Sequence, residues 1–165
     1  MAVSMAAPAE PAAPTSSPSS TMATIKLPLL TLPRYLYRVQ YSRTQTVYSP
    51  HTGLHAAISS TSWGRPDALT LQRAILSHFN WNSRVPSPFI STFADAKHAA
   101  HWGHRLPGKQ AVTVLKIATR KLGPQVKVFQ GLGQNEIMFF HTVPPRAIAR
   151  EVVPLKRFAA RVLVA

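Results

Sequence analysis

Apolar and polar side chains alternate in the segment YLYRVQY at 35–41, and this two-residue period predicts a β-strand. Leu and Ile recur at helical spacing after Asp67, which predicts a helix that begins there and ends at 80–83. A second helix is expected at 96–106 after Asp95, because aspartate is a favourable N-cap residue. Short apolar runs predict further strands at 89–93, 111–117, 125–129, 137–143 and 149–153.

This order of elements is typical of an α+β domain with a mostly antiparallel β-sheet. The domain is assigned to residues 26–153, and the Ser-, Thr-, Gly- and His-rich stretch 42–64 is expected to be a long loop within it. Residues 1–25, rich in Ala, Pro and Ser, bury too little apolar surface to fold and are predicted to be a disordered tail. Residues 154–165 are expected to form a basic amphipathic extension, either as part of the fold or as the start of a continuation.

Charge is the most unusual property of the chain. Nineteen Lys and Arg against five Asp and Glu give a net charge of +14, and all of the basic residues lie at or after Lys26. This charge favours contact with polyanions, such as nucleic acid, an anionic membrane or a phosphorylated cofactor. The basic residues are scattered, however, with no long run of the kind that marks a basic arm, so a diffusely basic domain is the alternative.

Several classes of site are excluded by what the sequence lacks. Without cysteine there are no disulfides, thiolate zinc sites or cysteine nucleophiles. The nucleophile elbow of hydrolases, the Walker loop and the dinucleotide-binding glycine motif are absent. His98, His101 and His104 recur in one predicted helix but lack a further strong ligand, so no metal is expected. No targeting pattern and no membrane-spanning run is recognised, and a cytoplasmic or nuclear location is expected.

Three short motifs occur in order along the chain: LYRVQY with Arg38, PFISTFADAKHAAHW with Ser91 and Thr92, and QNEIMFF with Gln134 and Glu136. Together they resemble the ADP-ribosyltransferase superfamily of the diphtheria- and cholera-toxin type. Its members carry an Arg or His on a first strand, a Ser-Thr-Ser-like motif on a central strand and a Glu at the start of a later strand. The chain is also similar to a fungal domain of unknown function that shares this skeleton. The resemblance implies a split, mostly antiparallel β-sheet core with two short helices.

The resemblance also implies a role for each matching residue. Glu136 would stabilise the positive charge that develops on the ribose when the nicotinamide bond of NAD breaks. Arg38 would bind a phosphate or the ribose of NAD through its charged fork, and Ser91 would orient Glu136. Thr92 would support the nicotinamide pocket. Gln134, which lies on the same side of an extended chain as Glu136, would meet the acceptor.

Phe93 departs from the family pattern, because members usually carry a third small or polar residue at that position. Its ring would either stack on nicotinamide or fill the pocket and mark an inactive relative. Taken singly, the matching residues also fit bland interpretations: Arg38 can be a solvent-facing strand residue and Glu136 a lone charge at the mouth of a strand.

The function implied is transfer of ADP-ribose from NAD, or hydrolysis of NAD, with a protein or a nucleic acid as acceptor. Gln134 resembles the members that modify Asn, Cys or guanine rather than Arg. The alternatives are a non-catalytic basic nucleic-acid-binding or ribonucleoprotein component, which the charge and aromatic content favour, and a catalytically inactive transferase-like interaction domain. The sequence does not indicate an oligomeric state.

Overall fold

The computed structural model describes residues 31–80, 83, 85–106, 112–133, 135–149, 153–154 and 156. The expected N-terminal tail and most of the expected C-terminal extension lie outside these residues. Within the part of the chain that the structure describes, no helix is both long enough and apolar enough to cross a membrane.

Among the described residues, six strands form the main sheet in the order β6-β7-β4-β1-β5-β9, and every neighbouring pair is antiparallel. They are β1 (Tyr35–Gln40), β4 (Phe89–Phe93), β5 (Thr113–Ala118), β6 (Val128–Gln130), β7 (Glu136–Phe140) and β9 (Val153–Pro154). A second antiparallel sheet has the order β2-β3-β8, with β2 (Val47–Ser49), β3 (Gly53–His55) and β8 (Thr142–Val143). The predicted α+β class with a mostly antiparallel core in two sheets is confirmed.

The helices are short: α1 (Ser60–Trp63), α2 (Ala68–Phe79), α3 (Ala96–His104), and the single 3₁₀ turns η1 (Thr119–Lys121) and η2 (Pro145–Ala147). The two predicted N-caps are confirmed. Asp67 Oδ1 accepts a hydrogen bond of 2.7 Å from the Thr70 N–H, and Asp95 Oδ1 accepts one of 2.6 Å from the His98 N–H.

The prediction of a long loop at 42–64 was wrong, because this stretch contains β2, β3 and α1. Strands of three residues are too short to leave a readable alternation in the sequence. The pairing of β3 with β8, which Leu54↔Val143 illustrates, supplies stability that local sequence does not encode. The strand predicted at 125–129 is displaced, because β6 spans Val128–Gln130. Residues 150–152 of the strand predicted at 149–153 lie outside the described residues, and Val153 begins β9.

The strand predicted at 137–143 is broken at His141, where the chain leaves the main sheet for the second one. His141 has a left-handed backbone with φ of 64°, an uncommon conformation for a residue with a side chain. Its N–H donates to the Pro88 carbonyl and its carbonyl accepts from the Ala56 N–H, both at 2.7 Å. These two bonds, which join segments distant in sequence, hold the bend between β7 and β8.

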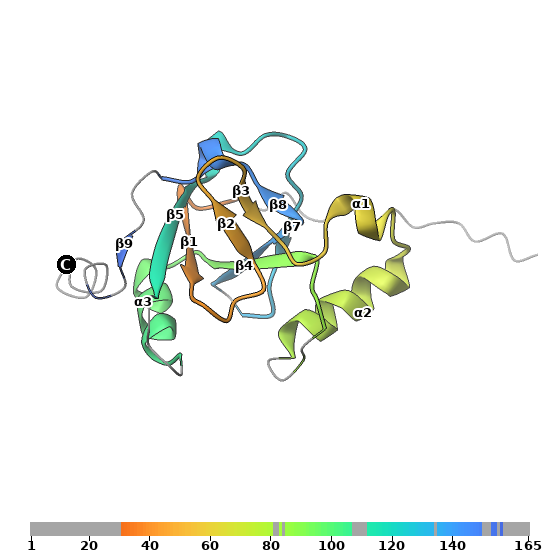
Figure 1. Ribbon diagram of the computed structural model, residues 1–165, viewed down its shortest axis with the longest axis horizontal. Helices are drawn as coiled ribbons and strands as arrows, with labels where there is room; N and C mark the ends of the chain where they lie inside the picture. Colours follow the sequence, from red (N-terminus) through yellow and green to blue (C-terminus); the bar gives the residue numbers. More distant parts are fainter. Residues whose placement is uncertain are drawn as a thin grey trace, which may run out of the picture.

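The main sheet is covered on both faces (Figure 1). On one face Leu36, Ile90 and Phe139 pack with Leu54 and Val143 of the second sheet. On the other face α3 lies over a smaller cluster, which consists of Val39, Phe93, Ala99, Ala100, Leu106, Val112 and Val114. Burying both faces accounts for the continuous apolar run at 137–140 in β7.

The pairing between β1 and β4 is the shortest in the main sheet. β1 pairs with β5 from Tyr35↔Ala118 to Gln40↔Thr113, but it is in register with β4 at a single point, Tyr37↔Phe93. Beyond this point the two strands diverge, and the sheet is split there.

Candidate functional site

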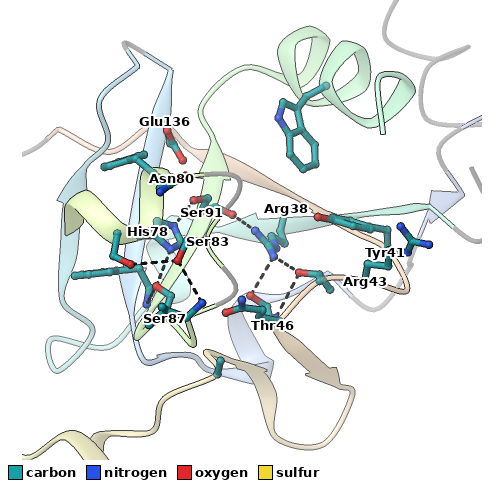
Figure 2. Close-up of a pocket in the computed structure, with 18 residues that line it drawn as sticks. Arg38, Tyr41, Arg43, Thr46, His78, Asn80, Ser83, Ser87, Ser91 and Glu136 are labelled. Atoms are coloured by element: carbon teal, nitrogen blue, oxygen red, sulfur yellow. Dashed lines mark hydrogen bonds between the residues drawn. The ribbon is translucent and has the colours of Figure 1, made fainter. Parts of the chain in front are cut away.

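A pocket of about 170 Å³ opens where β1 and β4 diverge, and we call it the split pocket. Its lining comes from β1, β4, β7, the end of α2, α3 and the segment that follows β1 (Figure 2). Arg38, Ser91 and Glu136, which come from three different strands, all line it. One residue from each of the three sequence motifs is therefore brought to one pocket.

Arg38 bridges the gap between the diverging strands. Its Nη1 donates to the Ser91 carbonyl at 2.8 Å, in place of a backbone bond between β1 and β4. Its Nη2 donates to Thr44 Oγ1 at 2.6 Å and to Thr46 Oγ1 at 3.0 Å, and Nε is buried without a partner. Since a guanidinium has five N–H groups, one on Nη1 is left to face a ligand. Arg38 thus offers a fixed positive charge and one donor, while its fork is used within the protein.

Ser91 and His78 form the polar floor of the split pocket. His78 Nε2 lies 2.7 Å from Ser91 Oγ, and His78 Nδ1 lies 2.7 Å from Ser87 Oγ. The Ser87 hydroxyl also accepts a bond of 3.2 Å from the Phe89 N–H. Figure 2 shows the His78 ring between the two serines, below Glu136. The end of α2 is thereby attached to β4 through one imidazole.

Glu136 is half-buried at the start of β7, and the preceding turn determines its position. Its N–H donates to the Gly133 carbonyl at 3.1 Å, and its carbonyl accepts from the Gly131 N–H at 2.8 Å. Gly131 lies directly against the side chain: a Cβ at this position would be 2.6 Å from Glu136 Cγ. The glycine is required there by close approach, because any larger residue would push the carboxylate out of place.

Burial shifts the pKa values of three side chains in the split pocket, those of Glu136, Arg38 and His78. Burial raises the pKa of Glu136, and a hydrogen bond from Ser91 and the charge of Arg38 oppose that rise. Burial also lowers the pKa of Arg38 to about 10, so the guanidinium stays charged at neutral pH. Burial and the nearby Arg38 lower the pKa of His78 to about 4, so its imidazole is neutral at pH 7.

The neutral imidazole of His78 donates in one of its two hydrogen bonds and accepts in the other. The Ser91 hydroxyl has one proton, and when it donates to the Glu136 carboxylate it must accept from His78 Nε2–H. His78 Nδ1 then carries no proton and accepts from the Ser87 hydroxyl, which in turn accepts from the Phe89 N–H. In that tautomer the bonds run in one direction, from the Phe89 N–H through Ser87 and His78 to Ser91.

The remaining predicted site residues lie elsewhere. Thr92 is fully buried on the other face of β4, where its hydroxyl donates to the Ile137 carbonyl at 2.7 Å. Phe93 packs under α3, with its ring 5.0 Å from that of His98 and 5.6 Å from that of Trp102, and it does not line the split pocket. Gln134 lies outside the described residues.

Sequence reasoning missed His78 and the segment that follows β1. His78 sits in the last turn of α2, where one His on a partly apolar helix gives no distinct signal. Thr44 and Thr46 were assigned to a loop, and only the fold shows that they hold Arg38. Arg43 is exposed and lines the same pocket.

The His-rich helix provides no cluster of metal ligands in the described structure. His98, His101 and His104 lie on α3, and in the part of the chain that the structure describes no three His, Cys, Asp or Glu side chains gather closely enough to hold an ion. His98 instead packs against Phe93 and contributes positive potential near Glu136.

Comparison with known families places most of this chain in one of them. Residues 31–158 match the family described as Domain of unknown function (DUF7587), which covers both sheets and every residue of the split pocket. No curated protein and no solved structure matches the chain. The chain belongs to the DUF7587 family.

Proposed function

We propose that this member of the DUF7587 family binds NAD in the split pocket and transfers its ADP-ribose group to an acceptor or to water. One observation carries the proposal: Arg38, Ser91 and Glu136, from three strands, line one pocket. This is the arrangement that the resemblance to ADP-ribosyltransferases implies. A lone charge on a strand would have no reason to be half-buried beside a fixed guanidinium.

The reaction breaks the bond between C1′ of the ribose and the nicotinamide nitrogen. The electron pair of this bond leaves with nicotinamide, which becomes neutral, and positive charge develops on the ribose. In this proposal the carboxylate of Glu136 stabilises that charge and holds a ribose hydroxyl. The nucleophilic atom of the acceptor then bonds to C1′, and its proton passes to Glu136 or to solvent.

Binding of the phosphates falls to Arg43 and Arg38 together. The exposed Arg43 has its whole fork available at the pocket, whereas Arg38 retains one N–H and its charge. Tyr41 and Trp102, with ring centres 6.1 Å apart, supply an aromatic wall for the nicotinamide or the adenine. Phe93, which packs under α3, is assigned a structural role.

The test measures release of labelled nicotinamide from NAD, which reports both transfer and hydrolysis. We expect the wild-type protein to release nicotinamide and Glu136→Gln, which preserves side-chain shape, to lose about 100-fold or more of the rate. Arg65→Gln, at an exposed residue that lines neither pocket, is the control and should retain the wild-type rate. Equal rates for wild type and Glu136→Gln, or no NAD binding by calorimetry, would remove the proposal.

Ser91→Ala tests the orienting role separately. Because the bond from Ser91 lowers the pKa of Glu136, its loss should shift the acidic limb of the rate profile to higher pH and reduce the rate about tenfold. A lower rate with an unchanged pH profile would assign Ser91 to the fold alone.

A further inference from the structure

A second pocket, of about 210 Å³, lies at the other side of β1 and has a different chemistry. It is lined by Tyr35, Lys116, Ala118, Arg120, Lys121 and residues 147–149, and we call it the basic pocket. Three of its side chains are cationic and one is aromatic. We propose that the basic pocket binds single-stranded nucleic acid, with phosphates on the cations and a base against Tyr35. This inference does not rest on the proposed transferase activity.

The cations of the basic pocket are unopposed within the described structure. Asp67 and Asp95 cap α2 and α3, and Glu136 lines the split pocket, so no carboxylate among the described residues lines the basic one. Arg120 and Lys121 are exposed at the η1 turn. Such a concentration of positive charge at a concave surface attracts phosphates.

Tyr35 gives the basic pocket an aromatic surface with cations at its ring. Lys116 Nζ lies 3.9 Å from the ring centre, and Arg34 Cζ lies 5.3 Å from it. Half-buried Tyr35 and Lys116 project from neighbouring strands, which holds the ammonium beside the ring. An aromatic ring among cations is the arrangement by which proteins bind single strands, since bases stack while phosphates pair.

The backbone around the basic pocket is held by bonds between distant segments. Thr119 Oγ1 donates to the Pro33 carbonyl at 2.7 Å, and the Thr119 N–H donates to the Arg34 carbonyl at 3.2 Å. The Ala149 N–H donates to the Lys116 carbonyl at 2.8 Å. The backbone that carries the cations is therefore held in place, which reduces the entropic cost of binding.

The two pockets are separate sites on one sheet. Glu136, Phe93, Tyr37 and Lys116 are cross-strand neighbours in a single row, so three strand spacings separate the first from the last. At about 4.8 Å per spacing this distance is roughly 14 Å. A nucleic acid in the basic pocket need not enter the split pocket.

The experiment measures binding of a fluorescent oligothymidylate to the full chain by anisotropy, over a range of salt concentrations. Arg120→Gln with Lys121→Gln removes two charges from the basic pocket. Its matched control, Arg65→Gln with Lys97→Gln, removes one exposed Arg and one exposed Lys from elsewhere. Circular dichroism confirms that each protein is folded.

We expect the basic-pocket pair to lower the slope of log affinity against log salt by about 1.4, which corresponds to roughly 25-fold weaker binding at 0.1 M salt. The control pair should change affinity by about twofold or less. Tyr35→Leu should weaken binding about fivefold or more with no change in the salt slope, because it removes stacking and not charge.

Four outcomes would overturn the inference. Equal losses in the two charge pairs would mean that binding follows diffuse charge and not this pocket. Tighter binding of a duplex of the same length would exclude a single-strand site. Binding to vesicles that contain phosphatidylserine, with none to oligothymidylate, would identify a membrane surface instead. An unchanged affinity for Tyr35→Leu would remove the stacking role.

Discussion

The split pocket and the basic pocket share strand β1 and differ in how they hold their cations. Arg38 is fastened by three hydrogen bonds to Ser91, Thr44 and Thr46, whereas Arg120 and Lys121 are exposed at a surface turn. A fastened cation is part of the fold and contributes a fixed field to chemistry within the pocket. An exposed cation is free to follow a partner and contributes little to stability. Arginine therefore has a structural role in the split pocket and a proposed role in recognition in the basic pocket.

The largest effect that this comparison predicts is on stability. Arg38→Ala removes the bridge between β1 and β4 and the hydrogen bonds that Arg38 donates to the Ser91 carbonyl and to the hydroxyls of Thr44 and Thr46. We expect a loss of about 3 kcal/mol in the free energy of unfolding, measured with urea. Arg43→Ala, which removes an exposed arginine of the same pocket, should change it by about 0.5 kcal/mol or less. Similar losses for the two variants would show that Arg38 is not a structural bridge.

The next effect is on the pH dependence of stability. The pKa of His78 is lowered from 6.5 to about 4 in the folded protein, so the unfolded chain binds the extra proton between these values. Stability is therefore lost as pH falls through this window, by about 2 kcal/mol between pH 7 and pH 5. The raised pKa of Glu136 acts in the opposite direction, since its stabilising contribution is present at low pH and is lost as pH rises.

His78→Gln isolates the histidine, because Glu136 titrates in both proteins and its contribution cancels in the difference. Urea unfolding at a series of pH values should show a smaller loss toward pH 5 in the variant than in the wild type. Parallel curves would contradict a neutral His78 in the chain of bonds to Ser91.

A smaller effect is expected where the turn before β7 supports Glu136. Gly131→Ala places a methyl group 2.6 Å from Glu136 Cγ and should reduce the free energy of unfolding by about 1–2 kcal/mol. Gly133→Ala is the matched control, because its methyl would be 3.9 Å from Glu136 Cβ, an ordinary contact. That variant should be neutral or slightly more stable by up to about 1 kcal/mol. A larger loss of stability for Gly133→Ala than for Gly131→Ala in urea unfolding would contradict this account of Glu136.

The smallest expected effect is the change in stability when the exposed cations of the basic pocket are removed. Arg120→Gln with Lys121→Gln should change the free energy of unfolding by no more than about 0.5 kcal/mol, because neither exposed side chain is part of a buried network. Thermal unfolding followed by circular dichroism measures this directly. A large loss would place these residues in the fold and not at a recognition surface.

Prediction from sequence succeeded where one segment carries its own signal. The helices after Asp67 and Asp95 were found because a cap and a periodic apolar face are local properties. It failed at 42–64, where three-residue strands depend on partners as distant as Val143. It also failed at His141, whose left-handed backbone is stabilised by Pro88 and Ala56 and not by its neighbours in sequence.

The site divides in the same way. Sequence motifs selected Arg38, Ser91 and Glu136, and the fold brings these residues to one pocket. Successive side chains of β4 point to opposite faces of the sheet, but the sequence does not say which face is which. Only the packed structure shows that Thr92 faces the core and Phe93 faces α3. His78 joined the site only because the end of α2 is bound to β4.

The sequence by itself determined the two longer helices and their caps, the longer strands, the basic charge and the order of the three motifs. These follow from local periodicity, from capping chemistry and from composition, which need no tertiary contacts. The tertiary structure decided where β1 and β4 part, which acceptors hold Arg38 and where cations gather beside Tyr35. Each of these depends on strands that are distant in the chain and meet only through pairing and packing, so no single stretch of sequence contains the answer.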